Sequence, residues 1–170
     1  MAEIERTRTR ERDAGEMTPY DVFIRSRAEF HERQNAGQVV VGLEDREYFN
    51  TKQGKLAYYL NAEKYKNTPL QDWRVFTHSL ITHSGKHRHQ GGLVIYVIEG
   101  VGWSVVDGER VDWEAGDLLL LPIKKGGVEH QHFNAKPGSE CHWIAFSYMP
   151  FFDYNASEFT QTEVSPLYNK

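Results

Sequence analysis

From residue 73 onward, short runs of apolar residues alternate with turns that contain glycine. The runs at 73–81, 93–98, 103–106, 118–121 and 142–148 are rich in β-branched and aromatic residues, which favour strands. Between two of these runs, Asp107 and Gly108 form a two-residue hairpin signal, because both residue types tolerate a positive φ. Many short and closely spaced strands predict a β-sandwich or barrel, and they leave no room for βαβ units.

The residues before 73 show a helical pattern instead. Thr18 suits the N-cap of a helix and Pro19 its first position. Apolar side chains then recur near the helical period before a stop at residues 35–37, namely at Tyr20, Phe23, Ile24 and Phe30. We expect this helix, a strand-like run at 39–41 and the aromatic stretch that follows to pack on the outside of the main domain.

The first residues of the chain are strongly charged. Residues 1–16 mix acids with arginines and contain almost nothing apolar, which is typical of a disordered arm. The sequence therefore predicts three parts: a charged arm at 1–17, a helical extension at 18–72, and a β-domain with a C-terminal tail at 73–170.

Composition narrows the class of protein. The 170 residues suffice for one domain of ordinary size, and the net charge of −4 gives no electrostatic footprint for nucleic acid. Cys141 is the only cysteine, so it cannot form an internal disulfide, and it favours a reducing compartment. No apolar run approaches the ~18 residues that a membrane span needs. We expect a cytoplasmic protein without a nucleic-acid or membrane partner.

The histidines gather in one part of the chain, since seven of the eight lie between residues 78 and 142. His87 and His89 flank Arg88. Because alternate residues of a strand share a face, both rings should point to one side and Arg88 to the other. The same parity, carried into the strand at 93–98, places residues 93, 95 and 97 on the histidine face and residues 94, 96 and 98 outside.

His130 and His132 repeat this spacing on a later strand. Two such pairs on different strands of a small barrel can converge, and three or four neutral imidazoles suit iron, zinc, copper or nickel. The remaining histidines of the cluster are interpreted as structural or surface residues, namely His78, His83 and His142.

The spacing of these residues resembles the two motifs of the cupin superfamily. The first motif has a His-x-His pair, a Glu and a Gly, for which this chain has His87, His89, Leu93 and Gly100. The second has a Gly, a Pro, a His and an Asn, for which this chain has Gly116, Pro122, His130 and Asn134. The resemblance covers roughly residues 73–150. It implies an all-β fold, a small double-stranded β-helix or jelly-roll barrel, here with an N-terminal helical extension.

The glutamate ligand of the motif is absent, because Leu93 stands in its position. The resemblance then implies a three-histidine metal site of His87, His89 and His130, with Gln90 and Glu129 as the nearby substitutes for the missing carboxylate. Gentisate-type ring-cleaving cupin dioxygenases are similar in lacking this glutamate. They use Fe(II), and they commonly contain two cupin units where this chain has one.

This likeness predicts a mononuclear Fe(II) dioxygenase that takes O₂ and a small hydroxybenzoate-like, catechol-like or enolisable substrate. Zinc, nickel, manganese and copper are the alternative metals. His132 is the candidate acid/base or substrate-binding group, and its alternative role is that of an interior histidine held by a polar neighbour. A metal-dependent lyase or isomerase and a non-catalytic metal- or ligand-binding module remain alternative functions.

Two further expectations concern arginines and assembly. An anionic substrate needs a counter-ion, for which Arg74 is a candidate, although a surface charge is the simpler interpretation. Arg88 should point away from the site.

Small barrels often pair through sheet edges, so we expect a homodimer, with the run at 39–41 as a candidate pairing segment.

Overall fold

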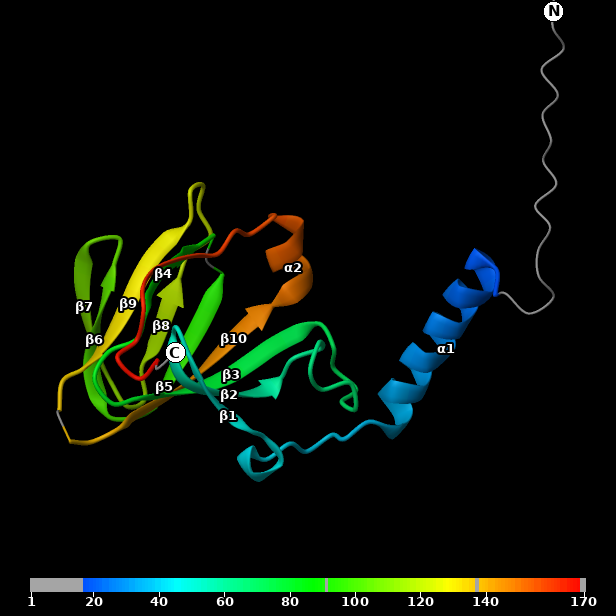
Figure 1. Ribbon diagram of the computed structural model, residues 1–170, viewed down its shortest axis with the longest axis horizontal. Coiled ribbons are helices and arrows are strands. Elements are labelled where there is room, and N and C mark those ends of the chain that lie inside the picture. The colour runs from blue at the N-terminus through cyan, green and yellow to red at the C-terminus, as the bar shows by residue number, and fades with distance from the viewer. Residues whose placement is uncertain (1–16, 91, 137, 169–170) are drawn as a thin grey trace, which may run out of the picture.

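The computed structural model describes residues 17–90, 92–136 and 138–168, and most of the predicted charged arm lies outside these ranges. The described part of the chain forms two antiparallel sheets that face each other as the walls of a small barrel (Figure 1). The all-β prediction is therefore confirmed.

The strand order brings segments together that are far apart in the chain. The six-stranded sheet has the order β1 (Tyr48–Thr51), β2 (Gly54–Leu60), β3 (Trp73–Leu80), β10 (Cys141–Tyr148), β5 (Leu93–Glu99) and β8 (Leu118–Leu121). The five-stranded sheet has the order β11 (Thr160–Glu163), β4 (Lys86–His89), β9 (Val128–Asn134), β6 (Val101–Val106) and β7 (Glu109–Glu114). Helix α1 (Pro19–Ala36) and the short turn η1 (Leu43–Asp45) precede the strands, and α2 (Met149–Tyr154) follows β10.

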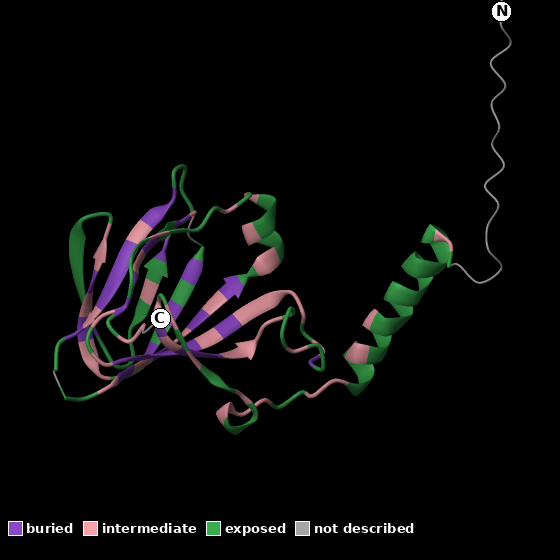
Figure 2. Ribbon diagram, viewed as in Figure 1, coloured by how far each residue is buried: buried purple, intermediate pink, exposed green. Residues whose placement is uncertain are grey.

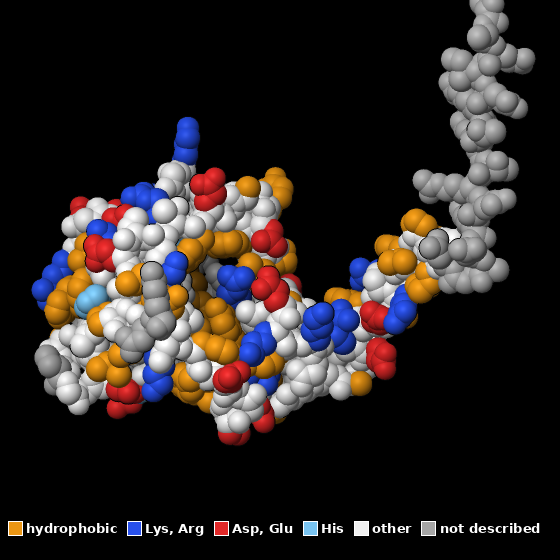
Figure 3. All heavy atoms as spheres, in the orientation of Figure 1, with side chains coloured by type: hydrophobic (Ala, Val, Ile, Leu, Met, Phe, Trp, Pro, Cys, Tyr) orange, Lys and Arg blue, Asp and Glu red, His pale blue; other side chains and the backbone are white. Residues whose placement is uncertain are grey.

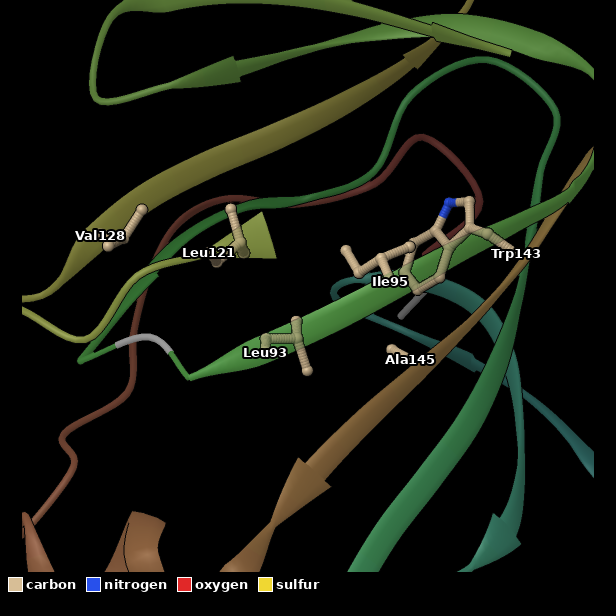
Figure 4. Close-up of a cluster of buried hydrophobic side chains, with 6 residues drawn as sticks. All are labelled: Leu93, Ile95, Leu121, Val128, Trp143 and Ala145. Carbon is tan, nitrogen blue, oxygen red and sulfur yellow. The ribbon is translucent and has the colours of Figure 1, made fainter. Parts of the chain in front are cut away.

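The core lies between the two sheets. Its main cluster contains Leu93, Ile95, Leu121, Val128, Trp143 and Ala145 (Figure 4). Along β5 the burial alternates as the parity argument predicts. Residues 93, 95 and 97 are buried, and residues 94, 96 and 98 are exposed. Burial of each large aliphatic side chain of this kind stabilises the fold by about 1.5–3 kcal/mol.

The hairpin between β6 and β7 forms at the predicted turn. Asp107 has φ 52° and Gly108 has φ 89°, and Val106 pairs directly with Glu109. Positive φ at both central residues gives a turn whose twist matches that of the flanking strands.

Helix α1 begins as the sequence predicts. The hydroxyl of Thr18 accepts a hydrogen bond from the backbone N–H of Asp21, and the Asp21 carboxylate accepts one from the backbone N–H of Thr18. This capping box satisfies backbone donors that would otherwise lack partners. The helix carries no buried residue, and it projects away from the barrel (Figures 1 and 2). No helix among the described residues is long and apolar enough to cross a membrane.

The structure differs in two places from what the sequence predicts for the N-terminal extension. The run at 39–41 forms no strand, and the side chains of Val39 and Val40 are 83% and 82% exposed, so the strand prediction there is wrong. The strands lie further along, where β1 and β2 extend the six-stranded sheet by pairing β2 with β3. The sheet is thus continuous across the predicted boundary at residue 73.

Candidate metal centre

Strands β4 and β9 bring the first three histidines together. They are antiparallel neighbours in which His87 lies directly opposite His130, and His89 follows on the same face as His87. The ring centroids of His87 and His130 are 4.1 Å apart, and those of His89 and His130 are 4.9 Å apart. One nitrogen of each of the three buried rings lies within 4.8 Å of the others. Convergence of the two pairs therefore places three imidazoles around one point.

The position of the missing carboxylate is apolar in the structure as well. Leu93 is buried and lines the same cavities as His87. Neither suggested substitute reaches the cluster. The Glu129 carboxylate lies 3.6 Å from the Arg88 guanidinium on the outer face of the sheet. The side-chain oxygen of Gln90 accepts a hydrogen bond from the Ser157 hydroxyl. Arg88 points outward as predicted, and the donor set near the three rings is purely imidazole.

Burial keeps these rings neutral. Desolvation lowers the pKa of His87 and of His89 to about 4, and the pKa of His130 falls well below its usual value. The neighbouring histidines also oppose protonation of His87 and His130. Nδ1 of His87 and Nδ1 of His130 are buried without a hydrogen-bond partner among the described residues. Three neutral, closely spaced imidazoles are a donor set that fits a divalent transition metal.

These pKa values predict an acid-sensitive fold for the metal-free protein. Between pH 6.5, the usual pKa of histidine, and pH 4, the unfolded chain binds protons that folded His87 and His89 do not. Stability should therefore fall as the pH falls through this range, by up to about 1.4 kcal/mol per pH unit for each histidine. Thermal melts of chelator-treated protein from pH 7.5 to 5 measure this slope. A melting temperature that stays constant or rises on acidification would contradict the lowered pKa values of His87 and His89.

His132 lies beside the three-histidine cluster and is held by a short chain of hydrogen bonds. The indole N–H of Trp113 donates to the Ser104 hydroxyl at 2.9 Å, and that hydroxyl lies 2.6 Å from Nδ1 of His132. Because an indole nitrogen only donates, the Ser104 oxygen accepts from Trp113. Towards His132 the hydroxyl donates when the ring proton is on Nε2 and accepts when it is on Nδ1. Burial lowers the pKa of His132 well below its usual value.

A fifth histidine lies in the same interior. His78 is buried, its ring contacts Trp143 edge-on at 4.6 Å, and its Nε2 has no hydrogen-bond partner among the described residues. Nε2 of His78 sits against Gly54, where an added Cβ would lie 2.2 Å away. A small inner cavity of about 20 Å³ lies within the barrel, and His78 lines it together with His87, His130 and His132. Its interpretation as a structural residue stays a prediction.

Side chains from the segments before β3 and after α2 complete the walls of the site, and the sequence pattern assigned no role to them. Phe159, in the segment between α2 and β11, stacks on His87 with ring centroids 4.8 Å apart, and it also faces His89. Gln53 and Tyr58 come from the β1–β2 hairpin. Their only sequence signal was the polar and aromatic character of residues 48–59.

These residues line an outer cavity of about 60 Å³ that opens beside the cluster. It is bounded by Gln53, Tyr58, Arg74, Phe76, His87, His89, Leu93, Ser147, Phe152 and Phe159. A dry cavity that holds benzene measures about 150 Å³. An aromatic substrate would therefore require lining side chains to move. Phe159 is the natural candidate, because half of its surface is exposed.

Comparison with known families and proteins finds one family match and several similar proteins. Residues 82–147 match the Cupin domain family. A gentisate 1,2-dioxygenase of a Streptomyces species is 35% identical over 80 residues, which are 46% of this chain and 22% of that protein. The chain thus spans less than a quarter of the length of this curated relative.

Two solved structures resemble the fold. A variant of salicylate 1,2-dioxygenase from Pseudoaminobacter salicylatoxidans, in complex with gentisate, aligns with a TM-score of 0.53 at 22% identity, over 85% of this chain and 37% of that one. Streptomyces Pac13 with uridine, a nucleoside dehydratase, aligns with a TM-score of 0.55 at 17% identity, over 75% of this chain and 94% of that one. At these identities the likeness concerns the fold alone.

Proposed function

We propose that this protein, whose barrel is a cupin domain resembling gentisate-type dioxygenases, is a mononuclear non-haem Fe(II) dioxygenase. Its substrate would be a small aromatic molecule of the hydroxybenzoate or catechol type, or an enolisable one. The observation that carries the proposal is the buried, purely imidazole cluster of His87, His89 and His130.

The chemistry of that cluster supports the choice. Three histidines on one side of a metal leave positions for substrate oxygens and O₂, as in Fe(II) oxygenases with a facial triad of ligands. When bound, Fe(II) would supply Lewis acidity, a template for the two reactants and a path for electrons. Because the three ligands are neutral, the full charge of the metal would be available to a phenolate or enolate. The apolar side chains of Leu93 and Ile95 would keep water from the reacting face.

His132 is the proposed acid/base or substrate-binding residue. It lines the inner cavity with His87 and His130, and Ser104 fixes its orientation through Nδ1. Nε2 of His132 would donate a hydrogen bond to a substrate oxygen in one tautomer and accept one from a substrate hydroxyl in the other. We expect His132 to hold a substrate oxygen by hydrogen bonding.

Oxygen uptake tests the reaction type and the substrate class together. Protein reconstituted with Fe(II) should consume O₂ with one member of a panel of hydroxybenzoates, catechols and β-diketones. Protein loaded with zinc is the control, because Zn²⁺ has no redox chemistry, and it should consume none. An absence of uptake across the panel by protein that retains its iron would contradict the dioxygenase proposal.

A lyase or isomerase is the second candidate, and the Pac13 likeness favours it. That nucleoside dehydratase overlaps this chain over 94% of its own length, so a single barrel of this size is compatible with catalysis. A lyase would convert its substrate under argon as well as in air. A non-catalytic ligand-binding module would bind a ligand without consuming it in either condition.

The identity of the metal is likewise proposed. Metal analysis of protein purified anaerobically should find close to one iron per chain. Zinc in its place, which has no redox chemistry, would favour the lyase or the binding module.

A cytoplasmic location, inferred from the lone cysteine, is also a proposal. Cys141 is buried and free in the structure.

A homodimer is the proposed assembly, and one exposed surface supports it. The outer face of the six-stranded sheet carries Val94, Tyr96, Ile98, Leu118 and Leu120, all exposed, with Val94 opposite Leu120 and Tyr96 opposite Leu118. Contiguous apolar surface of this kind marks interaction sites. Light scattering at micromolar concentration tests the proposal, and a monomeric mass would refute it.

A further inference from the structure

We propose that Arg74 binds an anionic group of the substrate at the mouth of the barrel, separate from the oxygens that face the histidines. The inference rests on the proposed function and narrows it. Among the aromatic and enolisable molecules considered above, it selects those that carry a carboxylate in addition to their metal-facing oxygens. The evidence is the position of Arg74, the charges around it and its lack of a partner.

The sheet register directs Arg74 toward the site. On β3, Arg74 shares a face with Phe76 and His78, which are interior-facing residues, and it lies opposite the buried Ser147 of β10. Arg74 therefore lies on the face that points into the barrel, nearer its mouth than His78. It lines the outer cavity that also contains His87 and His89. The alternative of an ordinary outward-facing surface charge does not agree with this register.

Arg74 is the only lysine or arginine that lines the outer cavity, and the ten lining residues include no carboxylate. The charge of Arg74 also reaches Tyr58: burial raises the pKa of Tyr58, and the positive charge of Arg74 lowers it. A partly buried guanidinium in a cavity without carboxylates favours an anionic ligand.

No carboxylate of the described residues forms an ion pair with Arg74, since the nine ion pairs in this part of the chain involve other groups. Glu63, Asp72 and Asp153 line the adjacent groove, which Arg74 also borders, yet none of the three is paired with it. Figure 3 shows a hollow on this face of the barrel that is rimmed largely by hydrophobic side chains, with basic and acidic side chains beside it.

The guanidinium group suits a carboxylate. It presents a planar pair of N–H donors that matches the two oxygens, and such charge-assisted pairs are stronger than neutral hydrogen bonds. Gln53 and Tyr58 line the same cavity and supply further polar groups near the ligand. One substrate could thus present two oxygens to the histidines and a carboxylate to Arg74.

Binding under anaerobic conditions tests this assignment independently of turnover. Calorimetry on Fe(II)-loaded protein compares catechol with 3,4-dihydroxybenzoate and 2,3-dihydroxybenzoate, which have the same adjacent hydroxyls and add a carboxylate. The wild type should bind at least one of the two acids more tightly than catechol. In Arg74→Gln, the Kd for that acid should rise roughly 10- to 100-fold, while the Kd for catechol changes less than about threefold.

Two further variants make the result decisive. Arg110→Gln is the matched control, because Arg110 is exposed on β7 and pairs with Asp112 away from the cavity, and it should leave every Kd unchanged. Arg74→Lys keeps the positive charge but lacks the planar pair of N–H donors. It should recover part of the affinity for the acid that Arg74→Gln loses. Circular dichroism verifies that each variant is folded.

The proposal is overturned if Arg74→Gln weakens catechol and the acids equally, if it weakens neither, or if the wild type binds no acid more tightly than catechol. Failure of the dioxygenase proposal appears in a different measurement. If the acids bind through Arg74 but no O₂ is consumed, the anion site stands and the reaction type is wrong.

Discussion

Replacing His87 with alanine should abolish metal retention and, with it, all metal-dependent activity. The variant removes one of three neutral donors and leaves two, which no longer surround the ion on one side. We expect metal affinity to fall by at least about 100-fold, because even a residue that only supports a ligand changes affinity by 10- to 100-fold. Metal content per chain after gel filtration, measured by mass spectrometry, gives the result.

His142→Ala is the control for this experiment. His142 belongs to the same run of histidines in the sequence, but in the structure it lies on the outer side of β10, 3.2 Å from the Glu140 carboxylate. Its replacement should leave metal content unchanged. If His87→Ala folds and still holds one metal per chain, the proposed ligand set is wrong.

The largest effect on stability should come from Ile95→Ala. The side chain of Ile95 is 1% exposed and packs in the main cluster with Leu121, Val128 and Trp143 (Figure 4). Truncation removes buried apolar surface and leaves a cavity that the surrounding sheets cannot fully close. The free energy of unfolding should fall by about 2–5 kcal/mol. Urea denaturation followed by tryptophan fluorescence measures the change.

Ile98→Ala makes the same chemical change on the opposite face of the same strand. Ile98 is 49% exposed, so at a concentration where light scattering shows a monomer its truncation should alter stability by no more than about 0.5 kcal/mol. Equal losses for the two variants would show that β5 does not alternate as described. The pair therefore tests the strand parity on which the location of the histidine site depends.

The sequence was sufficient for the barrel and for the grouping of the three histidines because both depend on a period of two. A strand places alternate residues on one face whatever surrounds it, so the positions of His87, His89, Leu93 and Ile95 followed from counting. The repeated spacing also predicted that the two His-x-His pairs could converge, and the pairing of β4 with β9 is what brings them together. The absence of a carboxylate was visible directly, because Leu93 occupies its place.

What the sequence left out depends on contacts between distant segments. Phe159 reaches His87 only because β11 pairs with β4, and nothing in the composition of residues 149–164 indicates that pairing. Gln53 and Tyr58 enter the site because the six-stranded sheet continues beyond β3. The orientation of Arg74 required the register of β3, which short-range patterns do not provide. Long-range pairing sets these positions, and local propensity does not.

The pairing of β4 with β11 also bears on how the protein is made. Strand β4 carries two of the three histidines, and its neighbours are β9 and β11, both of which lie later in the chain. During synthesis on the ribosome, His87 and His89 emerge well before either neighbour does, on a strand whose backbone groups are still unpaired. All three rings could hold the proposed ion only after β9 has been translated, and Phe159 joins them later still. Insertion of that ion would therefore be an event of the finished or nearly finished polypeptide, and a nascent chain stalled before residue 128 would have no complete site to load.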